Sequence, residues 1–180
     1  MAAYTFLHPL NQGTAAQNFT VTGTNPLAAI GMRYGAIDPN YGYGEFIYCR
    51  GNAASSASSG AWVVMSNFSA VLAQQNMSVG IGGPVGVVAG DLSATSVYGW
   101  VQVYGVCDFA KAATNNSIAA GRGVFIAATA GRVNSSVQAG TGNMLIFGAV
   151  AGSSYTSSQS NSFTAFLNNP QLVGNTYYFT

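Results

Sequence analysis

The chain has 180 residues, a length that suits one domain or one compact domain with an extended arm. It carries five Lys and Arg and four Asp and Glu, so that charged residues make up 5% of the sequence, against about 25% in ordinary soluble domains. Hydrophobic residues make up 49%, including ten Tyr and ten Phe. This composition excludes intrinsic disorder, which needs low hydrophobicity and high net charge.

The charge pattern also limits the possible partners. A net charge of +1 with scattered cations offers no basic patch for DNA or RNA. No membrane segment is expected, because the longest apolar stretch, residues 79–90, is interrupted by Gly and Pro. The N-terminus lacks the basic and long apolar regions of a signal peptide, which predicts synthesis in the cytoplasm. Cys49 and Cys107 are too few for a disulfide framework, so we expect two buried thiols.

In chain order, residues 1–25 are polar and irregular and predict an extended N-terminal arm. Short runs of β-branched and aromatic residues follow, each bounded by Gly, Ser, Asn or Pro. These runs predict strands at residues 45–50, 61–65, 85–89, 100–107, 124–128, 145–150 and 163–167. Their spacing predicts a single all-β domain over residues 26–170, an antiparallel barrel or sandwich of short strands. Residues 171–180 form a C-terminal aromatic tail.

The clearest strand lies at residues 100–104, where alternation places Val101 and Val103 on one face and Trp100, Gln102 and Tyr104 on the other.

Little helix is expected, at most a turn or two at residues 68–75 and 108–113. The Gly/Ala/Ser-rich residues 51–60 predict a flexible loop, and residues 152–162 predict a second one.

The chain offers few groups for catalysis. The single histidine, His8, lies in the irregular arm, where no carboxylate would orient it as a base. Turn or cap positions explain three of the four carboxylates, Asp38, Asp91 and Asp108, the last as the cap of a short helix. The Cys and His residues are too few for a structural zinc site, and no phosphate-binding loop precedes the single lysine. We therefore expect no enzyme, no cofactor and no metal site.

Several segments carry a family resemblance through their order along the chain. They are GEFIY at residues 44–48, PVGVVAGD at 84–91, YGWVQVYG at 98–105, AAGRGV at 119–124, GRV at 131–133 and FGAV at 147–150. Over residues 25–170 this order of turns and apolar strands resembles the tailed-bacteriophage capsid decoration (cement) proteins. The resemblance implies a structural virion protein on the outer capsid surface. Its partners would be the major capsid protein and further copies of itself, as dimers or trimers at symmetry axes.

Both ends of the chain carry aromatic residues, which are common anchors at interfaces. The predicted capsid or subunit contacts are Tyr4, Phe6, Leu7, Tyr177, Tyr178 and Phe179. Extended ends of this kind can add a strand to an exposed sheet edge. The alternative is that the ends fold back on the domain that carries them.

A second interpretation is a carbohydrate-binding or adhesive β-domain of a phage fibre or surface protein. In that case Trp62 and Trp100, with the many Tyr and amide side chains, would form stacking platforms for sugars. Trp100 lies in the middle of the clearest strand, where a core position is commoner, and this favours the first interpretation. On that interpretation, capsid binding should depend little on salt, because few ion pairs are available to screen. The isolated chain, with so few charges, should self-associate.

Overall fold

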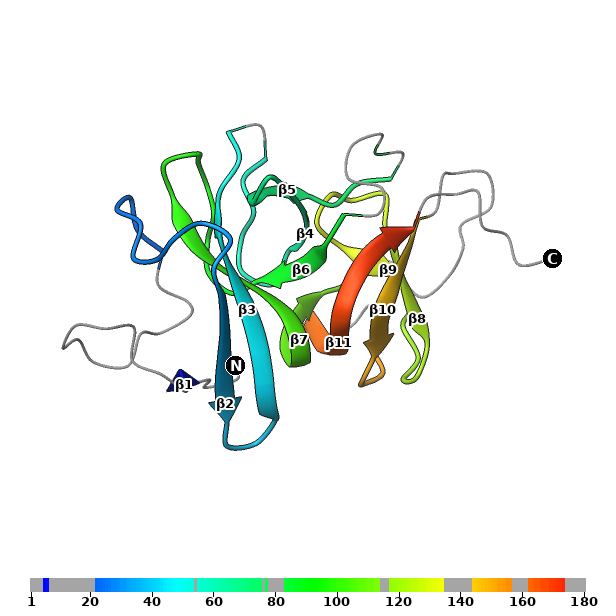
Figure 1. The fold of residues 1–180 in the computed structure, drawn as a ribbon. Helices are drawn as coiled ribbons and strands as arrows, with labels where there is room; N and C mark the ends of the chain where they lie inside the picture. Colours follow the sequence, from blue (N-terminus) through cyan, green and yellow to red (C-terminus); the bar gives the residue numbers. More distant parts are fainter. Residues whose placement is uncertain are drawn as a thin grey trace.

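The computed structural model describes the backbone of residues 5–6 and residues 22–53, 55–75, 77, 83–113, 117–134, 144–156 and 162–173. These residues form strands and turns without helix, and the predicted all-β fold is confirmed. The eleven strands of the sheet (Figure 1) are β1 (Thr5–Phe6), β2 (Arg33–Asp38), β3 (Gly42–Arg50), β4 (Trp62–Ser66), β5 (Ser69–Leu72), β6 (Val85–Val88), β7 (Tyr98–Lys111), β8 (Gly123–Ile126), β9 (Val133–Asn134), β10 (Leu145–Ala151) and β11 (Ser162–Val173).

Five of these strands close on themselves and form a first barrel. β3 pairs with β7 antiparallel and with β5 through a single parallel pair, Arg50 with Ser69. Antiparallel pairings of β5 with β4, β4 with β6 and β6 with β7 complete the ring. The buried strand residues that fill it are Ile47, Cys49, Val63, Met65, Ala70, Val88, Val101 and Val103. Most of them are small or β-branched because few strands enclose a narrow interior.

A second barrel shares β7 with the first. The C-terminal part of β7 pairs with β11, which continues through β10 and β8 to β9. A parallel bridge between Ala112 and Val133 then brings β9 back beside the end of β7. β2 forms a hairpin with β3 at the other end of the sheet, and β1 pairs with β2.

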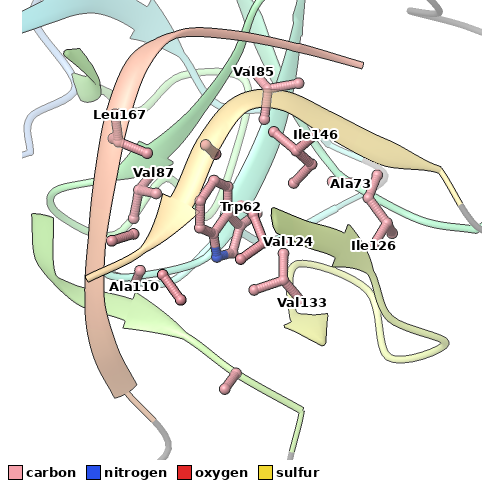
Figure 2. Close-up of a cluster of buried hydrophobic side chains, with 14 of the residues drawn as sticks. Trp62, Ala73, Val85, Val87, Ala110, Val124, Ile126, Val133, Ile146 and Leu167 are labelled. Atoms are coloured by element: carbon pink, nitrogen blue, oxygen red, sulfur yellow. The ribbon is translucent and has the colours of Figure 1, made fainter. Parts of the chain in front are cut away.

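β4 and β6 form the wall between the two cores. Val63 of β4 faces the first barrel, whereas Trp62 and Val64 face the second. In β6, Val88 faces the first barrel and Val87 faces the second. Figure 2 shows Trp62 surrounded by the apolar side chains of the second core. Because both faces are buried, β4 has a continuous apolar sequence rather than an alternating one.

β7 runs through both barrels. Its predicted alternation is confirmed, because Val101 and Val103 line the first core while Trp100 packs on the opposite face. There the Trp100 ring lies 4.8 Å from the ring of Tyr48, centroid to centroid. β7 pairs with β3 as far as residue 104 and with β11 from residue 104 onward. Gly105, with a φ of 91°, therefore stands where the strand passes from one barrel to the other.

The helical turns predicted at residues 68–75 and 108–113 are wrong. The first segment is β5, which follows β4 through a two-residue turn in which Asn67 and Phe68 have φ values of 47° and 56°. Two positive φ values are typical of the two-residue hairpin turn, whose second position usually holds Gly. Phe68 occupies that position here, so the sequence lacks the residue that normally indicates such a turn. The second segment continues β7, because β11 pairs with it. Asp108 therefore lies in a strand and caps no helix.

The described part of residues 51–60, a segment predicted to be a flexible loop, packs against the turn that follows β6. Ala57 is fully buried and exchanges two backbone hydrogen bonds with Leu92, of 3.1 and 2.7 Å. The N–H of Ser59 donates to Asp91 Oδ1 at 2.8 Å, which gives this predicted turn residue a partner in the loop. The small side chains thus allow close packing here.

Two further predictions are confirmed. Asp38 forms the predicted turn, since its Oδ1 accepts the backbone N–H groups of Asn40 and Tyr41 at 2.7 and 3.0 Å. Cys49 and Cys107 are free thiols, and both are buried.

Candidate functional site

Five of the six predicted terminal contacts lie outside the described residues: Tyr4, Leu7, Tyr177, Tyr178 and Phe179. The single histidine, His8, also lies outside them. Phe6 lies in β1, where its backbone pairs with Ala36 of β2. The main chain at Phe6 thus lies against the chain's own sheet, and the capsid contact of all six residues stays a prediction.

A tyrosine on the β2–β3 hairpin forms one side of a surface groove. Tyr43 lies on β3, and its ring covers Gly35 of β2, where a Cβ would stand 2.6 Å from the Tyr43 hydroxyl oxygen. That hydroxyl donates to Glu45 Oε1 at 3.0 Å. Partial burial, together with this hydrogen bond, raises the pKa of Tyr43 above its ordinary value. The hydroxyl therefore remains a protonated donor at neutral pH.

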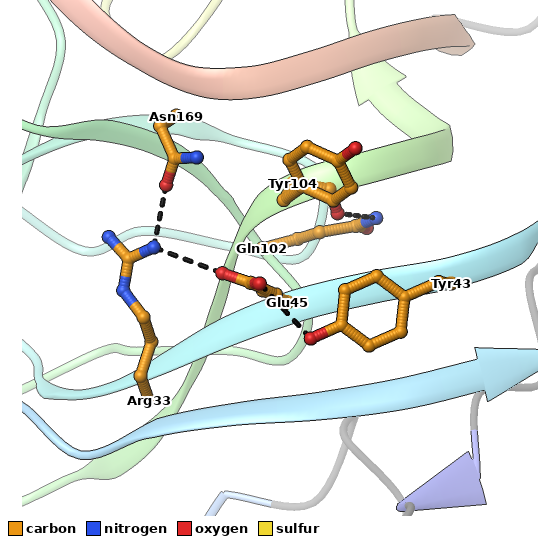
Figure 3. A network of polar contacts seen from close by, with 6 residues as sticks. All are labelled: Arg33, Tyr43, Glu45, Gln102, Tyr104 and Asn169. Atoms are coloured by element: carbon orange, nitrogen blue, oxygen red, sulfur yellow. Dashed lines mark hydrogen bonds and ion pairs between the residues drawn. The ribbon is translucent and has the colours of Figure 1, made fainter.

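An ion pair beside this tyrosine connects three strands (Figure 3). Arg33 Nη1 of β2 donates to Glu45 Oε2 of β3 at 3.0 Å and to Asn169 Oδ1 of β11 at 2.6 Å. The Arg33 side chain is 49% exposed, so the pair contributes little to stability. Its consequence is electrostatic, because the two opposite charges offset each other on this part of the surface.

A buried amide side chain hydrogen-bonds to the β7 backbone beside Gly105. Gln102 is fully buried, and its Nε2 donates to the carbonyl oxygens of Tyr104 at 3.2 Å and Val106 at 3.0 Å. These two carbonyls lie on either side of Gly105. A single side chain therefore fixes the β7 backbone at the passage between the barrels.

The groove itself runs between β3, β7 and β11. Its lining residues are Tyr43, Tyr104, Gly105, Val106, Phe166, Leu167 and Asn168. Register explains the arrangement, because Tyr104 pairs with Asn168 and Val106 with Phe166, each pair on the outer face. The rings of Tyr43 and Tyr104 lie 6.0 Å apart, centroid to centroid, at 57°.

The outer face of β10 and β11 beside this groove exposes large apolar side chains. Phe147 is 66% exposed, Phe166 50% and Val150 38%. Phe166 and Val150 are cross-strand partners. A bulge at Gly148, whose φ is 82°, brings Phe147 onto the same outer face. We refer to Phe147, Val150 and Phe166 as the apolar face; neither β10 nor β11 contains a charged residue.

A second group of exposed apolar residues lies beside the first barrel. Leu27, Ile30 and Met32 precede β2, and Phe68 occupies the β4–β5 turn. The Phe68 ring lies over Gly31, where a Cβ would stand 2.8 Å from it. This group therefore joins two segments that are far apart in the sequence.

The tryptophan platforms of the carbohydrate interpretation are not available. Trp62 and Trp100 are 0% and 1% exposed and belong to the cores. The rings that line the groove are instead the exposed Tyr43 and Phe166 and the half-buried Tyr104. Sequence reasoning missed the groove because its residues come from three strands, and no local pattern marks them as neighbours.

Among the described residues, no three His, Cys, Asp or Glu side chains come together to hold a metal ion. The same part of the chain forms no helix that is long and apolar enough to cross a membrane. Comparison of the chain with protein-family models, curated proteins and solved structures found no match.

Proposed function

We propose that this chain is a structural protein of a bacteriophage head, which binds the outer surface of the capsid and stabilises contacts between major capsid protein subunits. The order of turns and apolar strands over residues 25–170 supports this role by resemblance. The observation that carries it is the charge-free apolar face on β10 and β11. Such a face suits permanent burial against another protein.

The apolar face is large enough for a weak contact. A Phe side chain presents about 200 Å² of surface, so the exposed two thirds of Phe147 and half of Phe166 amount to about 230 Å² together. At about 25 cal/mol per Å², complete burial would contribute at most about 6 kcal/mol before the entropy of association is subtracted. One face alone would therefore bind weakly.

A second contact surface on the same domain would strengthen the binding. Figure 1 places the segment before β2 beside the first barrel and β10–β11 at the opposite side of the molecule. If each surface contacts a different capsid subunit, the second contact forms within an existing complex and gains from a high effective concentration. A chain that connects neighbouring subunits in this way would stabilise the shell.

The test is binding of the purified chain to undecorated bacteriophage heads. We expect binding to persist between 50 and 500 mM NaCl, on the order of a tenfold range in salt, because no charged residue lies on the apolar face. The double variant Phe147→Ser/Val150→Ser should weaken binding at least about tenfold. The matched control Tyr41→Ser, which changes an exposed residue of the β2–β3 turn, should bind normally.

Two results would contradict the proposal. One is release from heads by moderate salt, which requires an ionic interface. The other is unchanged binding of the double variant while its thermal unfolding matches the unmodified chain.

A further inference from the structure

We propose that the groove between β3, β7 and β11 is a binding site for a neutral oligosaccharide. Tyr43 and Tyr104 of this site lie outside the apolar face, whereas Phe166 belongs to both surfaces. The capsid variants change only Phe147 and Val150 and the sugar variants change only Tyr104, so failure of one proposal is distinguishable from failure of the other. The carbohydrate interpretation of the sequence placed stacking on tryptophans. The structure points to a different set of rings.

The first support is the aromatic geometry. Tyr43 and Tyr104 present two rings at 57° to each other with centroids 6.0 Å apart, and Phe166 lines the same groove. Tyr43 is 43% exposed and Phe166 is 50% exposed. A pyranose ring has an apolar C–H face that packs on such rings, and rigid tyrosines provide contact area at low entropic cost.

The second support is the charge of the groove. None of the residues that line the groove is charged. The nearby Arg33 and Glu45 form an ion pair with each other, so that their charges offset. A charged ligand would therefore find no counter-charge in the groove, and this favours uncharged sugars over phosphate, acidic sugars or basic peptides.

The third support is the supply of polar groups. Within the part of the chain that the structure describes, the Tyr104 hydroxyl and the Asn168 side chain make no hydrogen bond. Both residues line the groove, and they are cross-strand partners. Apolar contacts with a few convergent polar groups are the composition of a small-ligand site.

The experiment uses NMR of the full chain labelled with ¹³C on its tyrosine rings. The probes are neutral hexasaccharides of glucose (α-1,4 and β-1,4), xylose and mannose, with hexagalacturonate as the anionic probe. We expect at least one neutral probe to shift the Tyr43 and Tyr104 signals with a Kd of about 1 mM, a weak affinity that suits a shallow site. The Tyr41 signal should not move.

Variants separate stacking from folding. Tyr104→Ala should weaken binding at least about tenfold, whereas Tyr104→Phe, which keeps the ring, should lose only about two- to fivefold. The control Tyr41→Ala should bind as the unmodified chain does. The proposal is overturned if no neutral probe at 20 mM, about twenty times that Kd, shifts Tyr43 or Tyr104. It is also overturned if hexagalacturonate is the only probe that binds. A third contradicting result is a Tyr104→Ala variant that binds the neutral probe with the same Kd as the unmodified chain.

Discussion

The substitution Gly105→Ala tests the close contact between β7 and β3, because it adds one methyl group at the residue where β7 passes from one barrel to the other. The residue has a φ of 91°, where β7 changes partners from β3 to β11. A Cβ at this position would stand 2.4 Å from the carbonyl oxygen of Tyr43 and 2.9 Å from the Cα of Gly44. Both atoms belong to the backbone of β3, which Gly105→Ala would therefore have to displace.

The size of the effect follows from two contributions. An L-residue at positive φ costs about 1–2 kcal/mol. Overpacking against backbone that cannot rotate away adds about 1–3 kcal/mol. Gly121 provides a matched control, because its φ is 78° and nothing lies within 4 Å of the Cβ position. Gly121→Ala should show the conformational cost alone.

The measurement is the free energy of unfolding of both variants in urea, supported by their melting temperatures. We expect Gly105→Ala to be less stable than Gly121→Ala by about 1–3 kcal/mol, which is the overpacking contribution alone, or roughly 2–12 °C in Tm for a chain of this length. The gain from a stiffer unfolded chain is the same for both substitutions and cancels. Equal stability of the two variants would refute the close contact between β3 and β7.

Two further predictions concern buried polar groups. Tyr155→Phe removes a buried hydroxyl that has no hydrogen-bond partner among the described residues, so it should leave the urea stability unchanged or raise it by about 1 kcal/mol. Tyr48→Phe should lower the stability by about 1 kcal/mol, because the Tyr48 hydroxyl accepts the N–H of Leu27 at 3.0 Å. Equal losses of stability for the two variants would contradict this reasoning. Burial raises the pKa of Cys49 to about 12 and also raises that of Cys107. The stability that these thiols contribute should therefore be complete below about pH 8.5 and should fall above it by up to about 2.7 kcal/mol per pH unit. The measurement is the free energy of unfolding in urea at several pH values, for the unmodified chain and for a double Cys→Ala variant. Above about pH 8.5 this free energy should fall less steeply with pH in the variant. Equal slopes for the two proteins would argue against buried thiols.

The site shows the limit of local patterns. Tyr104 was correctly placed on the face opposite Val101 and Val103, yet this alternation does not reveal that Tyr43 lies beside it. The two tyrosines are brought together by the pairing of β3 with β7, and Asn168 joins them through β11. Each pairing joins segments that are distant in the chain, and single-sequence periodicity carries no information about which strands meet.

The sequence by itself determined the all-β class, the positions of most strands and the turn at Asp38, because these depend on side-chain type and on bonds within a few residues. Tertiary structure decided the rest. Trp62 and Val63 are neighbours in an apolar run, and only the two-barrel arrangement sends one to each core. It also decided that Phe166 is exposed, because nothing in the described structure packs over the outer face of β11 at that point. Burial is a property of the surfaces that meet, and a strand's own sequence records only that both of its faces can be apolar.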